Sequence, residues 1–295
     1  MKRYSFILMM LAAVACQHKD LCYDHPHQSG LEVNIDWTKS PDADVETMEL
    51  FLFPTEGGPA IHHTFQDRKG GRLTIPRGTY RAICTNSGKG ANRFSGLDTP
   101  FEEFEVTTRT VKESESSTIE PDMLYSSNQE SGIEVRDRQT GSVTFYPEQR
   151  TPLYTIIVKN VSNLKYTTDC VASISALAHG FYLGVNRPER GRTSQNFPMF
   201  RSDDTTLRGY MTMFGHCGDE ATTHIISLCF TLSDGTKTYY NYDITDRMND
   251  PAIEGKLSAT IVLDLELELP KPITNGSGFQ PTLDGWQDET IDVNS

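Results

Sequence analysis

The sequence is short of basic residues, and this shortage limits its partners. Its 27 Lys and Arg face 40 Asp and Glu, which gives a formal net charge of -13 at pH 7. The richest basic stretch, residues 187–192 (RPERGR), is short, is interrupted by Glu189 and is broken by proline and glycine. Because nucleic acid binding depends on neutralising many phosphates, we expect no nucleic acid partner and interpret this stretch as a solvated loop.

Cysteine is also scarce. The chain has six cysteines without regular spacing, so no disulfide framework is predicted. Cys84, Cys170 and Cys229 lie among apolar residues and are expected to be small core residues. No catalytic motif stands out either, and we expect a protein that is not an enzyme and needs no cofactor.

No apolar run is long enough to span a bilayer as a helix. The nearest, Tyr4–Ala15, follows two basic residues and ends in small residues, a pattern typical of a secretory signal. Cys16 comes next, as in the bacterial lipobox, although Ala13 stands where the lipobox usually has leucine. Residues 1–15 are therefore predicted to be a lipoprotein signal peptide, and Cys16 to be acylated and held in the membrane. The alternative is an ordinary secreted protein cut near Ala15.

Residues 16–30 are predicted to form a lipid-anchored tether. The tether carries a cluster of side chains of the types that bind zinc or copper, namely His18, Cys22, His25 and His27. Pro26 and Gly30 favour an extended segment, without the ordered surroundings that a ligand cage needs. We therefore expect no metal, with binding at this cluster as the alternative.

From residue 31 onward the periodicity is that of strands. Leu31, Val33, Ile35 and Trp37 alternate with polar residues, so the apolar side chains share one face. Further short strands, bounded by turn residues, are predicted over Met48–Phe53, Arg72–Ile75, Tyr80–Thr85, Phe101–Val106 and Val143–Tyr146. Arg109–Gly141 is poor in apolar residues, and we expect an excursion there with weak strands around Met123–Ser126 and Ile133–Arg136.

A second set of strands begins near Leu153. It is predicted to comprise Tyr154–Val161, Val171–Leu183 with a bend near Gly180, Leu207–Phe214, Ile225–Leu232 and Thr236–Ile244. Asp234 and Gly235, between the last two, are typical of a two-residue hairpin turn. Ile261–Leu269 alternates most clearly, and its residues Leu263, Leu265, Leu267 and Leu269 are expected to point inward.

Two runs of short antiparallel strands without crossover helices predict an all-β protein with two β-sandwiches in tandem. We place the N-terminal sandwich at residues 31–148 and the C-terminal sandwich at 149–270. Residues 271–295 then form a linker and a C-terminal strand that pairs in its own domain or reaches another chain. Its apolar anchors are Phe279, Leu283, Trp286, Ile291 and Val293.

One loop holds the side-chain types of a nucleophilic site, namely His216, Cys217, Asp219 and Glu220. Residues this close in sequence rarely reach the geometry of a catalytic triad. We therefore interpret the loop as an ordinary polar, glycine-flanked connection.

A second local cluster is a candidate glycan platform. It consists of Tyr239, Tyr240 and Tyr242 with Asn241. Alternating tyrosines are also what β-propensity favours, with Tyr240 and Tyr242 facing one way and Tyr239 the other. We adopt this structural interpretation and keep glycan binding as an alternative function.

A set of short motifs runs through nearly the whole mature chain. It comprises Cys16 followed by HKDLCYDHPH (residues 18–27), Trp37, MELFLFP (48–54), PRGTY (76–80), FYPEQRTPLY (145–154), MFG (213–215) and YDITD (242–246). Together these motifs resemble an uncharacterised lipoprotein family of the Bacteroidales. That family is similar in turn to the minor fimbrial anchor and fimbrillin-like proteins of type V pili.

The resemblance implies a fold, a place and a function. It implies two transthyretin-like Greek-key sandwich domains, lipid anchoring at the outer membrane, and assembly with fimbrillin-like subunits by strand exchange. Lys19 and Asp20 resemble, in part, the short signal that sends such lipoproteins to the cell surface. The function it implies is that of a fimbrial anchor or fimbria-associated subunit, with a surface glycan-binding lipoprotein as the alternative.

Stalk and tip subunits of that pilus class are expected to lose their first strand to an Arg-directed protease. Arg68, Arg72, Arg77 and Arg81 are the candidate positions in the first domain. We interpret them instead as exposed arginines at hairpin edges. An anchor keeps both its lipid and its first strand, and so ends the fibre at the membrane.

Overall fold

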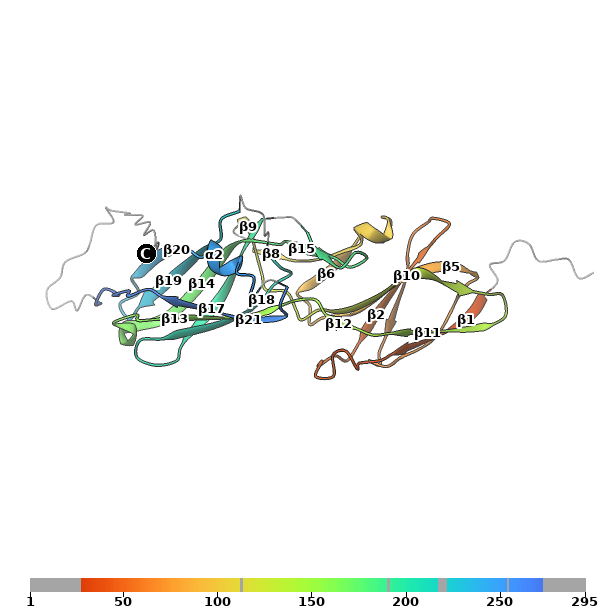
Figure 1. The fold of residues 1–295 in the computed structure, drawn as a ribbon, viewed down its shortest axis with the longest axis horizontal. Coiled ribbons are helices and arrows are strands. Elements are labelled where there is room, and N and C mark those ends of the chain that lie inside the picture. Colours follow the sequence, from red (N-terminus) through yellow and green to blue (C-terminus); the bar gives the residue numbers. More distant parts are fainter. Residues whose placement is uncertain (1–27, 112–113, 190–191, 217–221, 254, 273–295) are drawn as a thin grey trace, which may run out of the picture.

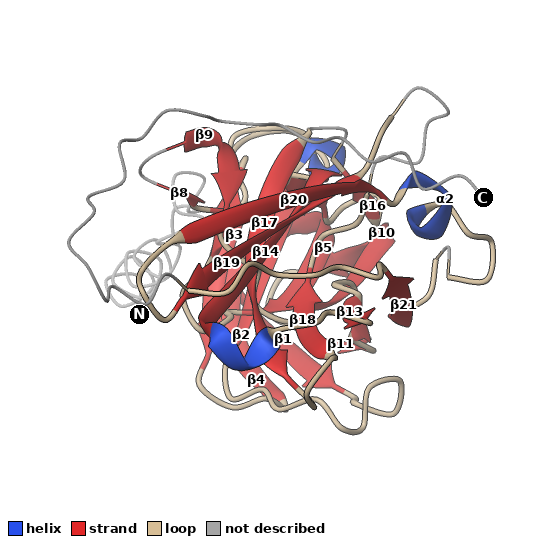
Figure 2. Ribbon diagram, turned by 90° about the vertical axis from the view of Figure 1, so that its left-hand side faces the viewer, coloured by secondary structure: helices blue, strands red, loops and turns tan. Residues whose placement is uncertain are grey.

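The computed structural model describes residues 28–111, 114–189, 192–216, 222–253 and 255–272. In this part of the chain nearly all regular structure is strand, which confirms the predicted all-β class, and Figure 2 shows how little of it is helical. The strands form two groups that follow each other along the long axis (Figure 1). No helix among the described residues is long and apolar enough to cross a membrane.

The first group contains two sheets. One has five strands in the order β12-β10-β5-β2-β3, and the other has three in the order β11-β1-β4. Their bounds are β1 (Gln28–Ile35), β2 (Met48–Pro54), β3 (Ile61–Phe65), β4 (Gly70–Pro76), β5 (Gly78–Asn86), β10 (Tyr125–Val135), β11 (Thr140–Phe145) and β12 (Glu148–Gln149). Residues 150–152 lead from β12 to the second group.

Apolar side chains from both sheets meet in one core. Leu31, Val33 and Ile35 of β1 are buried, as the alternation predicted, and they pack with Leu50 of β2 and Cys84 of β5. Removing this apolar surface from water supplies the main driving force for bringing the two sheets together.

The second group is one large sheet that bends back on itself. Its main path runs β20-β19-β14-β17-β18-β13-β21. The bounds are β13 (Leu153–Lys159), β14 (Thr167–Leu177), β17 (Thr193–Arg201), β18 (Leu207–Thr212), β19 (Ile225–Leu232), β20 (Lys237–Asp243) and β21 (Ser258–Asp264). β17 pairs first with β14 and then with β18, so it joins two arms that enclose a second core.

The two groups share one pattern of strand pairing. β1 lies between β4, to which it is antiparallel, and β11, to which it is parallel. β13 lies in the same way between antiparallel β18 and parallel β21. In each group the first strand therefore pairs in parallel with a strand from the end of that group, β1 with β11 and β13 with β21. Most other pairs in the described chain are antiparallel, as predicted, whereas these parallel pairs were not expected.

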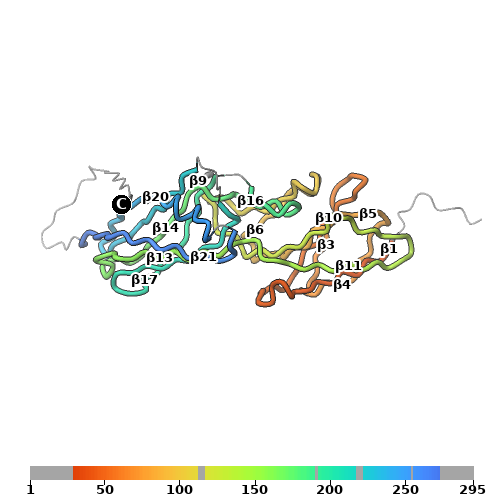
Figure 3. The backbone as a smooth tube through the Cα atoms, viewed as in Figure 1, coloured from red at the N-terminus to blue at the C-terminus, as the bar shows by residue number. Residues whose placement is uncertain are grey.

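A fourth sheet, made of four short strands, joins the two groups. Its order is β16-β15-β7-β6, from β6 (Asn92–Ser95) and β7 (Glu105–Thr108) of the first half of the chain and β15 (Gly180–Tyr182) and β16 (Arg187–Pro188) of the second. Figure 3 shows β6 and β16 between the two groups. In addition, β9 (Ser114–Thr118) lies parallel to β17 and pairs with β8 (Thr110–Val111). The chain thus crosses between the groups in both directions.

An aromatic cluster fills the space beneath this joining sheet. We call it the joining cluster, and it consists of Phe51, Phe53, Ile83, Phe101, Phe104, Val106, Leu124, Ala178, Phe181, Leu183 and Phe214. The packing is close at Gly184, where an added Cβ would lie 2.0 Å from the carbonyl oxygen of Phe101. Any larger side chain there would force the two halves apart.

The prediction of a strand over Phe101–Val106 is wrong in its first half. Residues Phe101–Glu103 form a short 3-10 helix, η1, and β7 begins only at Glu105. Phe101 and Phe104 are both buried in the joining cluster. A 3-10 turn has three residues per turn and places residues three apart on one side, whereas a strand would place them on opposite faces.

The excursion expected over Arg109–Gly141 is more ordered than predicted. The two weak strands expected there are parts of one strand, β10, which pairs with β5 on both sides of a bulge between Gln129 and Ile133. Gly132 has a φ of 87° in this bulge, a conformation that glycine adopts readily. Sequence alternation failed here because the bulge shifts the pattern.

Two other predicted strands end early. Val171–Leu183 is broken after Leu177, and β15 leaves the sheet to pair with β7. Ile261–Leu269 is regular only to Asp264, because Glu266 has a φ of 45°. Leu263, Leu267 and Leu269 are nevertheless buried as predicted, and Leu265 is partly buried against the same core.

The hairpin predicted at Asp234 and Gly235 is confirmed, with a longer loop. β19 pairs with β20, and the backbone N–H of Leu232 donates to the carbonyl of Thr236 at 2.8 Å. The loop therefore has three residues, not two. Gly235 has a φ of 84°, which suits the left-handed position of such a loop.

The joining cluster predicts cooperative unfolding. Phe104 is 0% exposed, so Phe104→Ala should lower the free energy of unfolding by about 3–5 kcal/mol. Because the joining sheet ties both groups together, urea denaturation followed by circular dichroism should show one transition shifted as a whole. Tyr239→Ala, at a side chain that is 54% exposed, is the control and should change little. Two separate transitions, only one of them shifted, would contradict this picture.

Candidate interaction surfaces

The residues predicted to carry the lipid and the export signal lie outside the described residues. These are Cys16, Lys19 and Asp20, together with the cluster His18, Cys22, His25 and His27. Their predicted roles stay predictions. Within the described ranges, no group of three or more His, Cys, Asp or Glu side chains is placed to hold a metal ion.

The first described strand fills the middle of its sheet. β1 is hydrogen bonded to β4 on one side and to β11 on the other. Leu31 and Val33 are almost fully buried beneath it. Removing β1 would therefore open a groove with two unpaired edges and an exposed core.

Unpaired strand edges are the surfaces on which a strand of another chain can be added. The outermost strands of the two large sheets, among the described residues, are β3, β12, β20 and β21. β20 is seven residues long, and its Lys237, Tyr239, Asn241 and Asp243 side chains are exposed on one face. A regular edge of this length suits strand addition better than the two-residue β12.

Glu49 on β2 holds the edge strand β3 in place. Its carboxylate lies 2.6 Å from His62 Nε2 and accepts a hydrogen bond from Thr64 Oγ1 at 2.7 Å. The His62 ring also stacks on Phe51 at a centroid distance of 4.6 Å. Burial alone would raise the pKa of Glu49, but hydrogen bonds from Ser87, Thr64 and His62 outweigh it and hold the pKa below its usual value.

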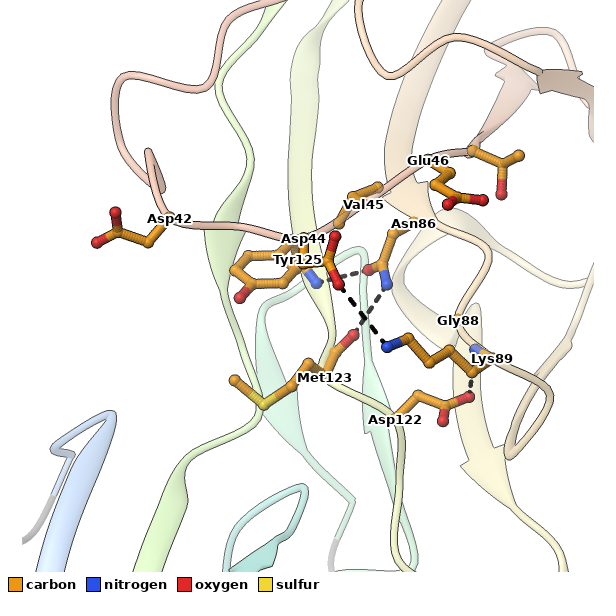
Figure 4. Close-up of a pocket in the computed structure, with 11 residues that line it drawn as sticks. Asp42, Asp44, Val45, Glu46, Asn86, Gly88, Lys89, Asp122, Met123 and Tyr125 are labelled. Carbon is orange, nitrogen blue, oxygen red and sulfur yellow. Dashed lines mark hydrogen bonds and ion pairs between the residues drawn. The ribbon is translucent and has the colours of Figure 1, made fainter.

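An acidic pocket of about 390 Å³ lies between three loops of the first group (Figure 4). Its lining includes four carboxylates, from Asp42, Asp44, Glu46 and Asp122. Asp122 is already engaged, because it accepts the backbone N–H of Lys89 at 2.7 Å and of Ala91 at 2.8 Å.

Structural hydrogen bonds also shape the floor of this acidic pocket. Asn86 Nδ2 donates to the Met123 carbonyl at 2.8 Å, and Asn86 Oδ1 accepts the Tyr125 N–H at 2.7 Å. These bonds fix the loops to one another. The pocket can attract cationic groups, yet each of its best-defined contacts serves the fold.

A shallow hollow at the end of the three-stranded sheet combines aromatic and polar side chains. It has a volume of about 830 Å³ and is lined by Asn34, Ile35, Asp36, Trp37, Arg68, Lys69, Thr144 and Tyr146. The Trp37 indole donates to the Arg68 carbonyl at 2.9 Å, and the Arg68 guanidinium lies 4.6 Å from the indole ring centre. Tyr146 is 42% exposed.

The candidate nucleophilic loop does not come together as a described site. Cys217, Asp219 and Glu220 lie outside the described residues. The His216 ring lies 5.3 Å from that of buried His224, whose Nδ1 is 3.2 Å from the Ser175 carbonyl. The described part of the loop therefore brings two histidines together, and sequence reasoning did not predict this pair.

The tyrosines of the candidate glycan platform face opposite ways, as the alternation predicted. Tyr242 is buried in the core, and Tyr240 packs against the same core. Tyr239 is on the other face and is 54% exposed. These rings therefore cannot form one platform.

The arginines considered as cleavage positions differ in their surroundings. Arg68 packs on Trp37, and Arg72 donates to Thr140 Oγ1 at 3.0 Å. Arg81 lies 3.9 Å from the centre of the Phe101 ring, whereas Arg77 is exposed in the turn between β4 and β5. Most of them thus have structural partners. In the basic stretch, Arg187 and Glu189 are described, and Arg187 packs on Tyr182 at 5.6 Å.

The cysteines expected in the core are there in two of three cases. Cys84 and Cys170 are buried, and Cys229 is half-buried on the opposite face of its sheet. Burial raises the pKa of the Cys170 thiol to about 12, so it is protonated at neutral pH and unreactive.

A surface that sequence reasoning missed lies on the second group. Five apolar side chains point outward from β13, β17, β18 and β21, and we call them the outer apolar face: Leu153, Ile157, Phe200, Tyr210 and Val262. Sequence patterns predicted strands at β13, β18 and β21, but no strand was predicted over β17, which the structure adds between them and β14. The signal that the opposite face is also apolar was present in β13, where Leu153 and Ile157 occupy the outward positions.

Residues 15–198 match the family described as Domain of unknown function (DUF5119). Over nearly its whole length the chain is similar to a protein of Bacteroides ovatus named putative fimbrium anchoring subunit Fim4B. The two are 21% identical over 325 residues, which cover 97% of this chain and 96% of that protein. These findings confirm the resemblance that the motifs predicted.

Solved structures share the fold. A putative adhesin from Bacteroides ovatus has a TM-score of 0.67 and 21% identity and covers 88% of this chain and 98% of its own. The fimbrial anchor protein Mfa2 from Porphyromonas gingivalis has a TM-score of 0.52 and 13% identity, and the match covers 80% of this chain and 90% of that protein. A structure described as putative polysaccharide binding proteins from Bacteroides thetaiotaomicron has a TM-score of 0.53 and 12% identity. The match covers 81% of this chain and 92% of that chain.

The hydrogen bonds of Glu49 predict a pH dependence of stability. Because its pKa is lowered on folding, the stabilisation is present above the unfolded-state pKa and is lost as the pH falls through the folded-state pKa. Glu49→Gln should therefore cost about 1–3 kcal/mol at pH 7 and progressively less in acid. Urea denaturation at several pH values measures this, with Glu130→Gln, an exposed carboxylate, as control. A cost that does not change with pH would contradict the assignment.

Proposed function

This chain belongs to the family described as Domain of unknown function (DUF5119), and from that premise we propose that it is a lipid-anchored fimbrial anchor or fimbria-associated subunit. The observation that carries the proposal is the similarity to a protein named as a fimbrium anchoring subunit, which extends over 97% of this chain and 96% of that protein. A similarity of this extent includes the N-terminal region as well as both groups of strands.

The membrane attachment in this proposal rests on the sequence. Cys16 carries the lipid at the end of the signal peptide, and the predicted tether spaces the body from the bilayer. Of the residues 16–30 predicted for this tether, the last three belong to β1, so the spacer is residues 16–27. Lys19 and Asp20 act in export to the outer face of the outer membrane. Such a protein is held at the cell surface by its acyl chains, and its folded part projects outward.

The architecture in this proposal is a pair of transthyretin-like sandwiches over residues 31–148 and 149–270. The repeated placement of β1 and β13, each between an antiparallel and a parallel neighbour, supports a duplicated plan. The joining sheet makes the pair one stiff body. Stiffness is useful in a protein that transmits pull from a fibre to a lipid anchor.

The position of β1 identifies the strand that an anchor would keep and a stalk subunit would lose. In a pilus built by strand exchange, a stalk subunit must lose its first strand to make a groove for its neighbour. Here β1 is paired on both sides, and its apolar side chains complete the core. A chain that keeps this strand fills its own groove and accepts no donor there.

Assembly with fimbrillin-like subunits then uses the remaining edges. The seven-residue edge of β20 offers a row of backbone donors and acceptors to an incoming strand. The work of the protein is mechanical and not enzymatic. The names of its relatives, fimbrial anchors and adhesins, support this reading.

Covalent crosslinking on intact cells tests the proposed function. Tagged chain should capture fimbrillin-like subunits, because an anchor touches the base of the fibre. A Cys16→Ala variant should release both the chain and the fibres into the medium, since no lipid holds them. Mass spectrometry of the crosslinked products and of the medium measures both effects.

The same experiment can refute the proposal. Recovery of the chain with itself only, or with glycan-uptake components, would rule out an anchor. Retention of the Cys16→Ala variant on washed membranes would rule out lipid attachment at that residue.

A glycan-binding surface lipoprotein is the second candidate, and the hollow beside Trp37 is the observation that favours it. Its two aromatic rings and several polar side chains are the groups that hold sugars. A glycan array with the mature chain tests it. Tyr146→Ala should abolish most binding, whereas Tyr239→Ala, at an exposed tyrosine elsewhere, should not. Absence of any bound glycan, or equal loss in both variants, would contradict this candidate.

A further inference from the structure

The outer apolar face has no partner within the described chain. Eight large apolar side chains are exposed in this part of the protein, and four of them lie on this one face: Phe200 (59%), Tyr210 (47%), Val262 (40%) and Leu153 (36%). Scattered exposed apolar residues are normal, but a concentration on one sheet face marks a docking surface.

The strand register makes this face continuous. Phe200 lies opposite Arg208, Arg208 opposite Ile157, and Ile157 opposite Val262, so four side chains form one row across four strands. Tyr210 lies two residues from Arg208 on the same strand and on the same face, and it borders this row. Neighbours in such rows are about 5 Å apart, so the row is a single contact surface.

The charges within the face are positive at its centre. Arg208 interrupts the apolar row and makes no ion pair with any described residue. Lys159 is exposed on the same side of β13, but exposed Asp264 of β21 lies directly opposite it, so Arg208 is the positive charge without an acidic neighbour across the strands. The face therefore suits an apolar partner that also carries carboxylates.

The described chain ends beyond the end of β13, one of the strands that carry this face. After β21 the Leu269 N–H donates to the Ser162 carbonyl at 3.2 Å, and its own carbonyl accepts from Asn163 Nδ2 at 2.7 Å. These contacts hold residue 269 just beyond the end of β13. A further 23 residues, 273–295, follow the described part. Fully extended they reach roughly 75 Å, against about 23 Å for the length of β13, so they can cross the whole face.

The chemistry of residues 273–295 matches the face. The segment contains five large aromatic or aliphatic residues after its Gly-Ser stretch, namely Phe279, Leu283, Trp286, Ile291 and Val293. It contains four acidic residues, Asp284, Asp288, Glu289 and Asp292, and neither lysine nor arginine. The apolar residues of the segment can pack on the apolar side chains of the face, and its carboxylates can pair with Arg208.

We propose that residues 273–295 dock on the outer apolar face of their own chain. Docking covers the apolar row and brings carboxylates to Arg208. Attachment to the same chain raises the effective concentration of the segment at the face, which favours this occupant over a second copy. The proposal is independent of a role in fimbriae. A partner that binds this face would first have to displace the C-terminal segment from it.

Tryptophan fluorescence provides a direct test. The chain has two tryptophans, so Trp37→Phe leaves Trp286 as the only one. The experiment uses the whole mature chain with Cys16→Ala, and a synthetic peptide of residues 273–295 gives the signal of the free segment. Trp286 in the chain should emit at shorter wavelength than in the peptide, and acrylamide should quench it less.

Two variants connect that signal to this face. Tyr210→Glu and Arg208→Glu, each at an exposed side chain, should return the emission and the quenching of Trp286 to those of the peptide. Tyr239→Glu is the matched control on the other arm of the sheet and should leave both unchanged. Circular dichroism checks that each variant folds.

Several results would overturn the proposal. Peptide-like emission in the parent chain would show that the segment is not docked. Protection that neither variant removes would place Trp286 elsewhere. Protection that is lost on dilution would assign the face to a second copy. If Trp37→Phe does not fold, the difference spectrum between the chain with Trp37 intact and its Trp286→Phe variant gives the same information.

Discussion

The contact on which the rest of this structure depends is the joining cluster beneath the sheet β16-β15-β7-β6. Two groups of strands in tandem would otherwise be free to move about residues 150–152. Instead the chain passes β6, β7 and β9 from the first group toward the second, and the second returns β15 and β16. The buried phenylalanines at this junction make separation of the groups costly, because their apolar surface would return to water.

A stiff junction changes what the surfaces can do. With the two groups held in one orientation, the edges β3 and β20, the acidic pocket and the outer apolar face keep fixed positions relative to one another. A fibre subunit bound at one edge would then pull on the whole body and, through it, on the proposed lipid at Cys16. If the two groups could rotate relative to each other, part of that force would rotate them and would not reach the lipid.

Sequence reasoning located most strands because one face of each is buried, and alternation records that burial directly. It failed where another constraint replaced the alternation of period two. Phe101 and Phe104 are three residues apart and need a 3-10 turn to reach one cluster. Gly132 permits a bulge that shifts the pattern of β10, and Glu266 ends β21 with a left-handed conformation. The sites were less predictable than the strands, because Trp37 and Tyr146, or Asp44 and Asp122, are distant in sequence and meet only in the folded chain.

By itself the sequence determined the all-β class, the buried face of each clear strand, the hairpin at Gly235 and the likeness to fimbrial anchor proteins. These depend on local periodicity, on turn chemistry and on short motifs, which a linear chain displays. Only the tertiary structure decided that β1 and β13 pair in parallel with β11 and β21, and that strands from both halves share one sheet. It alone decided that Leu153, Phe200, Tyr210 and Val262 lie on one exposed face. Strand order and register join residues that are far apart in sequence, and no local pattern carries that information.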